Sequence, residues 1–468
     1  MNPSFLGVDR SVTGRRWVLN DVDERSVLAL CQRHGVPELI ARVMIGRGVA
    51  LDAAPGFLSP TLRELLPDPA HLLDMNLAVE RLTRAVMTNE TIAIFGDYDV
   101  DGATSTALLM QFFEAVGGRV ILYIPDRIAE GYGPNAVAMA LLREQGANVV
   151  VTVDCGVSAF DALDAAAVVG LDVVVVDHHR AEARLPRAVA VVNPNRLDET
   201  SPCGHMAAVG IAFLVAVAVN RALRAAGWFE GRAAPDPMRW LDLVALGTVC
   251  DMVPLTGVNR ALVSQGLKVM AGRGNVGLSS LVDLMRIQER PEAWHLGYVL
   301  GPRINAGGRV GRADLGARLL STRDPVEAAA MAQALDQYNG ERQEIEAAVL
   351  LAAVEQVESR LDQGGPLLFA AGEGWHPGVV GIIAGRLKER YHRPVCVAGI
   401  NGGIVKGSGR SIPGIDLGSA ILAARQAGML ENGGGHAMAA GFTVRAERLA
   451  EFRTFLSERI TAEDWAEP

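Results

Sequence analysis

The sequence has few cysteines, and they follow no pattern of a cysteine site. It contains five, and no two of them form a CxxC pair: Cys31, Cys155, Cys203, Cys250 and Cys396. Their odd number and scattered positions argue against a disulfide framework. The missing CxxC spacing argues against a zinc site built from thiolates. The cysteines therefore indicate neither a secreted disulfide scaffold nor a thiolate metal site.

Long apolar runs and an excess of positive charge are also missing. The longest apolar run, about residues 207–219, is too short to span a bilayer, and the N-terminus lacks the pattern of a secretory signal. We therefore expect a cytoplasmic protein with no membrane partner. The net charge of −9 argues against a protein that coats nucleic acid non-specifically, although it allows a local basic groove or bound metal cations.

Apolar residues are plentiful, since they make up 50% of the 468 residues. A chain of this length and composition can bury large cores and should fold into about two to four domains. From about residue 91, apolar runs rich in Val and Ile alternate with helical segments that end in glycine. This pattern predicts an α/β domain with a parallel sheet that is covered by helices on both faces.

The patterning divides the chain into four segments. Residues 1–75 look helical and irregular, and residues 76–324 contain the predicted parallel sheet. Residues 325–362 have the periodicity of one long connecting helix, in which Gly340 is a weak point. Residues 363–468 form a second, smaller αβ domain. We therefore predict two αβ domains joined by a long helix.

Three acidic residues follow the first apolar run of the predicted sheet. The stretch IFGDYDVDG contains Asp97, Asp99 and Asp101. Like charges this close raise one another's pKa unless a cation lies among them. The pattern resembles part of a calcium loop, but the glutamate that closes an EF-hand is absent. A basic partner or an ordinary solvated loop is the other explanation of this cluster.

Further polar residues follow three more apolar runs. They are Asp154 after VVVTV, Asp177-His178-His179 after VVVV, and Asp251 in LVALGTVCDMVPL. Each alone is readily explained as a helix cap or a turn residue. Ligands of parallel sheets bind at the carboxyl ends of the strands, so we expect these groups to meet at one sheet edge. Carboxylates and imidazoles together suit Mn²⁺ or Mg²⁺, and their charge is enough to hold two ions.

These motifs resemble a known family in their order along the chain. GDYDVDG (96–102), DCG (154–156), DHH (177–179) and GTVCDMVPL (247–255) are similar to the four motifs of the DHH phosphoesterase superfamily. GPRINAGGR (301–309) resembles a further motif of its RecJ single-strand-specific exonucleases. WHPGVVGIIAGRL (375–387), GSGRSIPGIDL (407–417) and GGGHAMAAGF (433–442) resemble the DHH-associated domain of the same enzymes.

The resemblance implies an activity and a metal centre. The expected enzyme uses two Mn²⁺ or Mg²⁺ ions and hydrolyses single-stranded DNA from its 5′ end to mononucleotides, in DNA repair and recombination. The implied ligands or immediate supports are Asp97, Asp99, Asp101, Asp154, His178 and Asp251. Asp154 is the expected bridging carboxylate. His179 should point away from the ions and contact the phosphate or assist proton transfer, and Asp177 should orient the imidazoles.

The resemblance also implies a set of substrate-binding residues. Arg303, Asn305 and Arg309 should line the substrate path beside the metals, and five more should act from the second domain: His376, Ser408, Arg410, Ser411 and His436. Arginine forks suit phosphate oxygens, and hydroxyls on a glycine-rich backbone suit phosphate capture without base reading. A solvated surface arginine and a simple glycine-rich turn are the ordinary alternatives.

Two features depart from the family pattern. Many DHH phosphoesterases have a histidine where this chain has Phe95, so Asp97 is the expected substitute. RecJ exonucleases commonly continue into an oligonucleotide-binding barrel, whereas this sequence stops at Pro468. Two other functions stay open: a phosphodiesterase for short oligonucleotides or cyclic dinucleotides, and an inactive replication scaffold. Besides single-stranded DNA, a single-strand-binding protein and a helicase are the expected partners.

Overall fold

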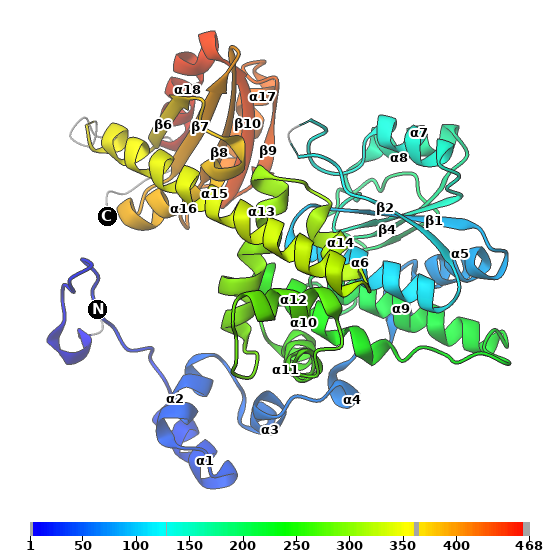
Figure 1. The fold of residues 1–468 in the computed structure, drawn as a ribbon. Helices are drawn as coiled ribbons and strands as arrows, with labels where there is room; N and C mark the ends of the chain where they lie inside the picture. The colour runs from blue at the N-terminus through cyan, green and yellow to red at the C-terminus, as the bar shows by residue number, and fades with distance from the viewer. Residues whose placement is uncertain (1–2, 128, 360–364, 462–468) are drawn as a thin grey trace.

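The computed structural model describes residues 3–127, 129–359 and 365–461. Within these residues the chain forms two five-stranded sheets, and one long helix runs between them (Figure 1). The predicted fold, a parallel-sheet domain joined by a long helix to a smaller αβ domain, is therefore confirmed.

The region before the first sheet consists of short helices. They are α1 (Glu24–His34), α2 (Glu38–Gly46), α3 (Ala54–Leu58), α4 (Leu62–Leu65) and α5 (Met75–Met87). The first three helices bury a small apolar core of their own, which includes Val27, Leu30 and Met44. Figure 1 shows α1 and α2 set apart below the two sheets, whereas α5 packs against the first sheet.

The first sheet is entirely parallel, with the strand order β2-β1-β3-β4-β5. Its strands are β1 (Thr91–Gly96), β2 (Arg119–Tyr123), β3 (Val149–Val153), β4 (Asp172–Val176) and β5 (Ala190–Val192). The helices between them are α6 (Val100–Ala115), α7 (Ala136–Glu144), α8 (Phe160–Val168) and α9 (Ala208–Ala225). Helices α7 and α8 cover one face, and α5, α6 and α9 cover the other (Figure 1). Because both faces are buried, the central strands are almost continuous runs of Val and Ile.

Helix α9 is longer than the sequence pattern suggested. Its 18 residues have a mean hydropathy of 1.6, so it could cross a membrane by length and composition. The helix extends beyond the uninterrupted apolar run, since its last turns contain Asn220, Arg221 and Arg224. However, 67% of the helix is buried inside the protein, where it packs against α5, α6 and α10 (Leu241–Cys250). It is a helix of the main hydrophobic core.

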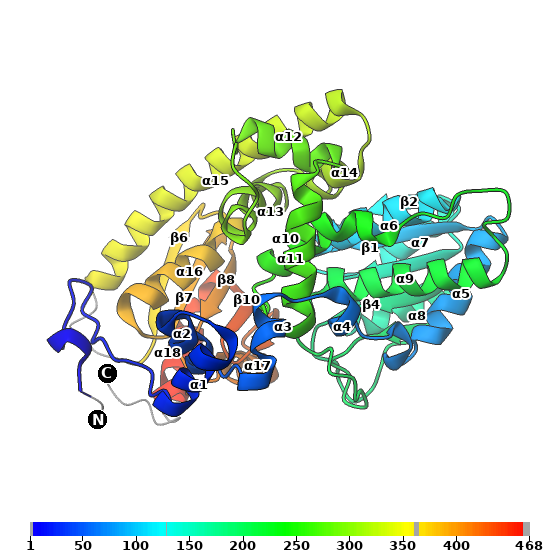
Figure 2. The ribbon, with the colours of Figure 1, turned by 90° about the horizontal axis from the view of Figure 1, so that it is seen from below.

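More helices follow the first sheet and lead to the second domain. They are α11 (Gly257–Ala271), α12 (Val276–Leu284), a π-helix (His295–Leu300), α13 (Gly301–Val310), α14 (Leu315–Ser321) and α15 (Pro325–Glu358). Helix α15 has 34 residues and is about 50 Å long. Asp324 caps its first turn, and Gly340 does not interrupt it. One end packs against α12 to α14 and the other against the second sheet (Figure 2).

The second sheet has the order β6-β7-β8-β10-β9 and is mixed. Strands β6 and β7 are parallel, and the other pairs are antiparallel. Its elements are β6 (Leu368–Glu373), α16 (Pro377–Tyr391), β7 (Val395–Asn401), β8 (Ile404–Arg410), α17 (Leu417–Gln426), β9 (Asn432–His436), β10 (Ala439–Arg445) and α18 (Leu449–Thr461). Helices α15 and α16 cover one face, and α17 and α18 cover the other.

Candidate active site

The register of the first sheet brings three motifs to one edge. Gly96 pairs with Val153, and Val153 pairs with Val176, so these strands end side by side. Asp97, Asp154 and Asp177 each follow one of these paired ends by one residue. The expectation that polar groups meet at the carboxyl edge of the sheet is confirmed for these three positions.

The start of α6 adds two more carboxylates to this edge. Asp99 is the N-cap of the helix and accepts a hydrogen bond from the backbone of Gly102 at 3.0 Å. A side chain at Gly102 would meet the backbone of Asp97 at 2.5 Å, so only glycine lets the helix start this close to the strand. Asp101 is buried, and its oxygens accept from Ala208 N and Val209 N at the start of α9. The helix starts therefore fix the position of these carboxylates.

Asp251 reaches the site from a different kind of element than expected. It was grouped with residues that follow strands, but it is the C-cap of α10. Its Oδ2 lies 3.6 Å from Nδ1 of His178. The apolar run before Asp251 is a helix that is buried from Leu241 to Thr248. A run that is apolar on every side has no periodicity that distinguishes a helix from a strand.

Both histidines of the DHH motif lie beside Asp154. His178 Nε2 is 3.3 Å and His179 Nδ1 is 3.9 Å from Asp154 Oδ1, and the two ring centroids are 4.7 Å apart. The expectation that His179 points away from the acidic cluster therefore differs from the structure. Asp177 accepts hydrogen bonds from both histidine backbones and from His179 Nδ1 at 2.7 Å. This carboxylate orients the pair.

The electrostatics of the cluster are unfavourable without a cation. Burial raises the pKa of Asp97, Asp101 and Asp154 well above the usual range, and neighbouring carboxylates add to the rise. Burial and the charge of Asp99 raise the pKa of Asp251 to about 7. The hydrogen bond and charge of Asp177 outweigh the effect of burial on His179 and raise its pKa to about 9. One histidine alone does not balance so many acidic groups.

The donor set fits divalent cations. Asp97 Oδ1, Asp154 Oδ1 and Asp251 Oδ2 are buried and lack a hydrogen-bond partner, which costs about 1–3 kcal/mol each. Three groups of side chains have ligand atoms within 4.8 Å of one another: Asp97, Asp99 and Asp154; Asp101, His178 and Asp251; and Asp154, His178 and His179. Asp154 belongs to two of these groups. Carboxylate and imidazole ligands are suited to Mn²⁺ and Mg²⁺.

Phe95 does not point into this cluster. It is fully buried under α7 and α8, and its ring stacks on Tyr123 with the centroids 5.2 Å apart. Asp97 lies in the group with Asp99 and Asp154 instead. That Asp97 takes the place of the expected histidine stays a prediction.

Arginines from three segments gather where the two domains touch. Arg309 on α13 donates from NH1 to the backbone oxygen of Gly378, the second residue of α16, at 3.0 Å. A side chain at Gly378 would lie 2.3 Å from Arg309 O, so glycine is needed for this close approach. Burial, followed by the nearby charge of Arg127, lowers the pKa of Arg309 to about 10 and also lowers the pKa of Arg410. Within the described residues, the hydrogen bonds of Arg309 and Arg410 go to Gly378, Ser408 and Gly409, and none of them reaches a carboxylate.

Arg127 is a residue of this arginine group that sequence reasoning did not identify. Its Cζ lies 5.1 Å from the ring centroid of Tyr98, next to Asp97, and its charge acts on His376 and Arg410 in the second domain. It follows strand β2 in a loop that carries no metal ligand. A basic residue soon after a strand end was the one signal that could have found it.

Two predicted substrate residues make internal hydrogen bonds, and their contact with substrate stays a prediction. Arg303 donates to Asp336 on α15 at 2.8 Å and to Val299 O at 2.7 Å, which ties α13 to the long helix. Ser411 is fully buried, and its hydroxyl donates to Ile415 O at 2.8 Å, which closes the turn before α17. Both side chains therefore stabilise the local fold.

The other predicted substrate residues are more accessible. Ser408 Oγ accepts from NH1 of Arg410 at 2.8 Å, so the pair forms one polar group on β8. His376 caps α16, and His436 is exposed at the end of the edge strand β9. Asn305 is half-buried on α13.

Tyr132 is a second residue that sequence reasoning missed. Its hydroxyl donates to Asp154 O at 3.0 Å and lies 3.5 Å from His179 Nδ1. Asp154 has a left-handed backbone with φ of 60°, which costs free energy for a residue other than glycine. The Tyr132 hydroxyl therefore helps to hold the strained backbone of Asp154, whose carboxylate lies at the centre of the cluster.

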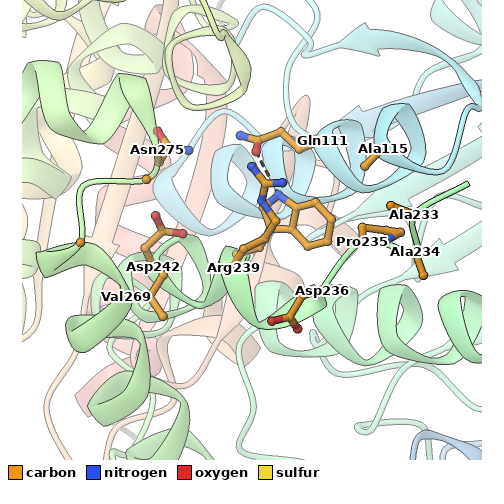
Figure 3. Close-up of a pocket in the computed structure, with 13 residues that line it drawn as sticks. Gln111, Ala115, Ala233, Ala234, Pro235, Asp236, Arg239, Asp242, Val269 and Asn275 are labelled. Atoms are coloured by element: carbon orange, nitrogen blue, oxygen red, sulfur yellow. Dashed lines mark hydrogen bonds between the residues drawn. The ribbon is translucent and has the colours of Figure 1, made fainter.

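A cavity of about 620 Å³ lies elsewhere in the first domain (Figure 3). Its lining includes Gln111 of α6, Arg239 of the 3-10 helix Pro237–Trp240 and Asp242 of α10. Gln111 is about 18 Å from Asp99 along the axis of α6. The Gln111 amide accepts a hydrogen bond from Trp240 at 2.9 Å. None of the predicted site residues lines this cavity.

Comparisons with known proteins agree with this geometry. The profile described as "DHH family, N-terminal domain" matches residues 91–248, and the profile described as "DHHA1 domain" matches residues 364–462. The chain is 42% identical to the single-stranded-DNA-specific exonuclease RecJ of Dickeya dadantii, over 91% of this chain and 75% of the relative. It is 37% identical to the enzyme of the same name from Bacillus subtilis, over 96% of this chain but 56% of the relative.

Solved structures give the same result. RecJ from Thermus thermophilus in complex with Mn²⁺ has a TM-score of 0.79 at 29% identity, over 95% of this chain and 62% of that chain. A manganese-bound exonuclease RecJ has a TM-score of 0.71 at 31% identity, over 85% of this chain and 96% of that chain. With a metal-suited carboxylate cluster, two domains of the expected types and relatives this similar, the chain belongs to the RecJ family of single-stranded-DNA-specific exonucleases.

Proposed function

We propose that this chain removes mononucleotides from the 5′ end of single-stranded DNA, using two Mn²⁺ or Mg²⁺ ions held at the edge of the first sheet. The observation that carries the proposal is the buried cluster around Asp154, whose unpartnered oxygens need cations. The family is one of exonucleases, so the cluster serves hydrolysis and the scaffold alternative is not favoured. The metal roles of Asp97, Asp99, Asp101, His178 and Asp251 belong to this proposal.

The residues of the cluster place and polarise one phosphodiester. When bound, the paired ions lower the pKa of an attacking water and neutralise the charge that develops on the phosphate oxygens. Asp154 sits between two of the ligand groups and fixes their spacing. Asp177 accepts a hydrogen bond from Nδ1 of His179, which leaves Nε2 to donate to a phosphate oxygen. Water adds to phosphorus, the bond from phosphorus to O3′ breaks, and the terminal nucleotide leaves with a 3′ hydroxyl.

The arginines between the domains would hold the 5′ phosphate of the strand. Arg127, Arg309 and Arg410 are like charges in a partly buried place, and a phosphate would relieve their repulsion. Each cleavage leaves a new 5′ phosphate on the shortened strand. The same group can therefore bind the strand again for the next cleavage. This feature favours an exonuclease over an enzyme that takes only cyclic dinucleotides, which have no phosphate monoester.

The test uses single strands labelled at one end. With Mn²⁺, a 5′ label should appear at once as mononucleotide, whereas a 3′ label should pass through a ladder of shortened strands. Asp154→Ala should abolish both, and Asp164→Asn, an exposed aspartate on α8, should not. A 3′ label that is released first, or equal turnover by Asp154→Ala at saturating Mn²⁺, would contradict the proposed polarity or the two-metal centre.

The cellular setting is also part of the proposal. A cytoplasmic location is supported by the burial of α9 in the core. A role in DNA repair and recombination, with a single-strand-binding protein and a helicase as partners, follows from the resemblance to the RecJ exonucleases. The domain limits given by the patterning, 1–75, 76–324, 325–362 and 363–468, are proposed as the functional units.

A further inference from the structure

A second hollow lies directly beside the carboxylate cluster. Its volume is about 350 Å³, within the range of about 300–1,000 Å³ typical of small-molecule sites. It is lined by Tyr132, Gly133, Pro134, Gly156 and residues 158–162. Of these residues, only Gly156 belongs to a motif that suggested metal or phosphate binding, the DCG motif.

One wall of this pocket is shared with the metal-suited cluster. The Tyr132 hydroxyl donates to Asp154 O at 3.0 Å and lies 3.5 Å from His179 Nδ1. Gly156, which lines the pocket, is two residues after Asp154. A phosphodiester held at the cluster therefore has its own sugar and base beside this opening.

The lining suits a flat, uncharged ring. Two aromatic residues face the pocket, and Tyr132 is 51% exposed, while Phe160 is half-buried. Gly133, Pro134 and Gly156 add a wall with little side chain, which lets a planar group approach closely. Asp161 is the one charged residue in the lining, and its negative charge disfavours a phosphate there.

Phe160 is not needed to complete the core beneath it. It is the first residue of α8, and the apolar cluster between the sheet, α7 and α8 does not include it. Its ring instead has Arg184 above it, with Cζ 4.9 Å from the ring centroid. A cation over one face of an aromatic ring leaves the other face for stacking on a base, as in many single-strand-binding surfaces.

We infer that this pocket receives the nucleobase of a nucleotide that flanks the scissile phosphate, and that it holds the base by stacking on Phe160 and Tyr132. The inference rests on the proposed function, because the scissile phosphate defines the position. Every base has a flat face, so the pocket grips the strand without reading its sequence. It thus adds a base contact to phosphate contacts that come from the arginines.

The experiment removes a base from the DNA strand and, separately, the aromatic ring of Phe160 from the enzyme. Single strands carry a 5′ ³²P label, and release of labelled mononucleotide reports the first cleavage alone. The strand is intact, or it lacks the base of nucleotide 1, 2 or 6. With the wild-type enzyme, loss of base 1 or base 2 should raise KM by about 5- to 20-fold, at the lower end of what stacked bases contribute, and loss of base 6 should have little effect.

Phe160→Ala should reproduce the defect on intact strands. The KM of this variant for the intact strand should rise by a similar factor. For the strand that lacks the base whose loss raised the wild-type KM, the KM of the variant should equal that of the wild-type enzyme. Phe160→Tyr should restore wild-type behaviour, and kcat should change little in all variants. The matched control is Phe57→Ala, because Phe57 is also half-buried with an arginine over its ring, Arg260 at 4.1 Å, but lies far along the chain from the pocket.

The outcomes separate this inference from the proposed function. If the wild-type enzyme hydrolyses the strands but Phe160→Ala weakens intact and base-free strands equally, the pocket does not hold the base. If no strand lacking base 1 or base 2 is a poorer substrate, the inference is also overturned. Should Phe160→Ala fail to fold, Phe160→Leu keeps the apolar volume without a π-face and should show the same loss. Absence of all cleavage by the wild-type enzyme would overturn the proposed function instead.

Discussion

Replacing Arg410 tests whether the second domain holds the DNA backbone. Arg410 ends strand β8, where its NH1 donates to Ser408 Oγ at 2.8 Å and to Gly409 O at 2.9 Å. In the part of the chain that the structure describes, no carboxylate is hydrogen-bonded to Arg410, and burial together with the charge of Arg127 lowers its pKa. A phosphate would supply the missing negative charge. Arg410→Ala should therefore weaken binding of single-stranded DNA without destabilising the fold.

The expected size of the effect follows from one charge-assisted contact. Such a hydrogen bond contributes about 1.5–3 kcal/mol, which corresponds to a loss of affinity of about 10- to 150-fold. Each phosphate contact also releases counterions, so the slope of log K against log salt should become shallower by about 0.7 for a single strand. Arg410→Lys keeps the charge but loses the planar fork, so it should lower affinity while the salt slope stays near the wild-type value.

The assay is fluorescence anisotropy of a labelled single strand at several salt concentrations, with a chelator present so that no hydrolysis occurs. Arg445→Ala is the matched control, because Arg445 is an exposed arginine of the same sheet that pairs with Glu431 at 2.8 Å. Thermal unfolding of each variant checks the fold. An unchanged affinity and salt slope in Arg410→Ala, with an intact fold, would refute the assignment of this arginine to the DNA backbone.

Three other substitutions test the electrostatics of the buried groups. Asp154→Asn removes a buried charge, and asparagine tolerates the left-handed backbone at this position. The unfolding temperature in chelator should therefore rise, and Mn²⁺ should no longer raise it further. An increase in unfolding temperature with Mn²⁺ that persists in this variant would contradict the bridging role. Burial raises the pKa of Asp242 to about 6, so Asp242→Asn should add up to about 3 kcal/mol of stability above pH 6. This gain in stability should fade as the pH falls from 6 to 4, because the aspartate of the wild-type protein becomes neutral in both the folded and the unfolded state. A gain that does not change with pH in urea unfolding would refute burial of a charged Asp242 as its cause. Glu346 on α15 is 2% exposed and pairs with Arg342 and Arg386, so Glu346→Ala should cost about 3 kcal/mol in urea unfolding, whereas the exposed Glu344→Ala should cost little.

Local pattern was enough to predict most of the secondary structure around the site. Val and Ile runs such as residues 149–153 and 172–176 became strands, and the segment predicted as a connecting helix became α15. Each of these features depends on residues close together in sequence. The same holds for Asp97, Asp154 and Asp177, because parallel strands of similar length must end at one edge.

Contacts between distant segments were not visible in the sequence. Asp251 comes from the end of a buried helix, and Arg127 comes from a loop with no motif. The sequence predicts Arg303 and Ser411 as ligands of a phosphate, and the structure adds their hydrogen bonds to Asp336 and to the Ile415 backbone. A residue type shows what a side chain can bind, but only its neighbours show whether a partner is already present.

The sequence by itself determined the family, the two αβ domains and the set of acidic residues at the sheet edge, because strand ends and helix starts are local features. Only the tertiary structure decided which basic groups act together, since the docking of α13 on α16 brings Arg309 to Gly378 and sets it near Arg127 and Arg410. It also decided that Tyr132, from the loop before α7, and Phe160, from the start of α8, line a pocket next to Asp154. Such sites depend on how whole elements pack, and packing involves residues that no short stretch of sequence contains.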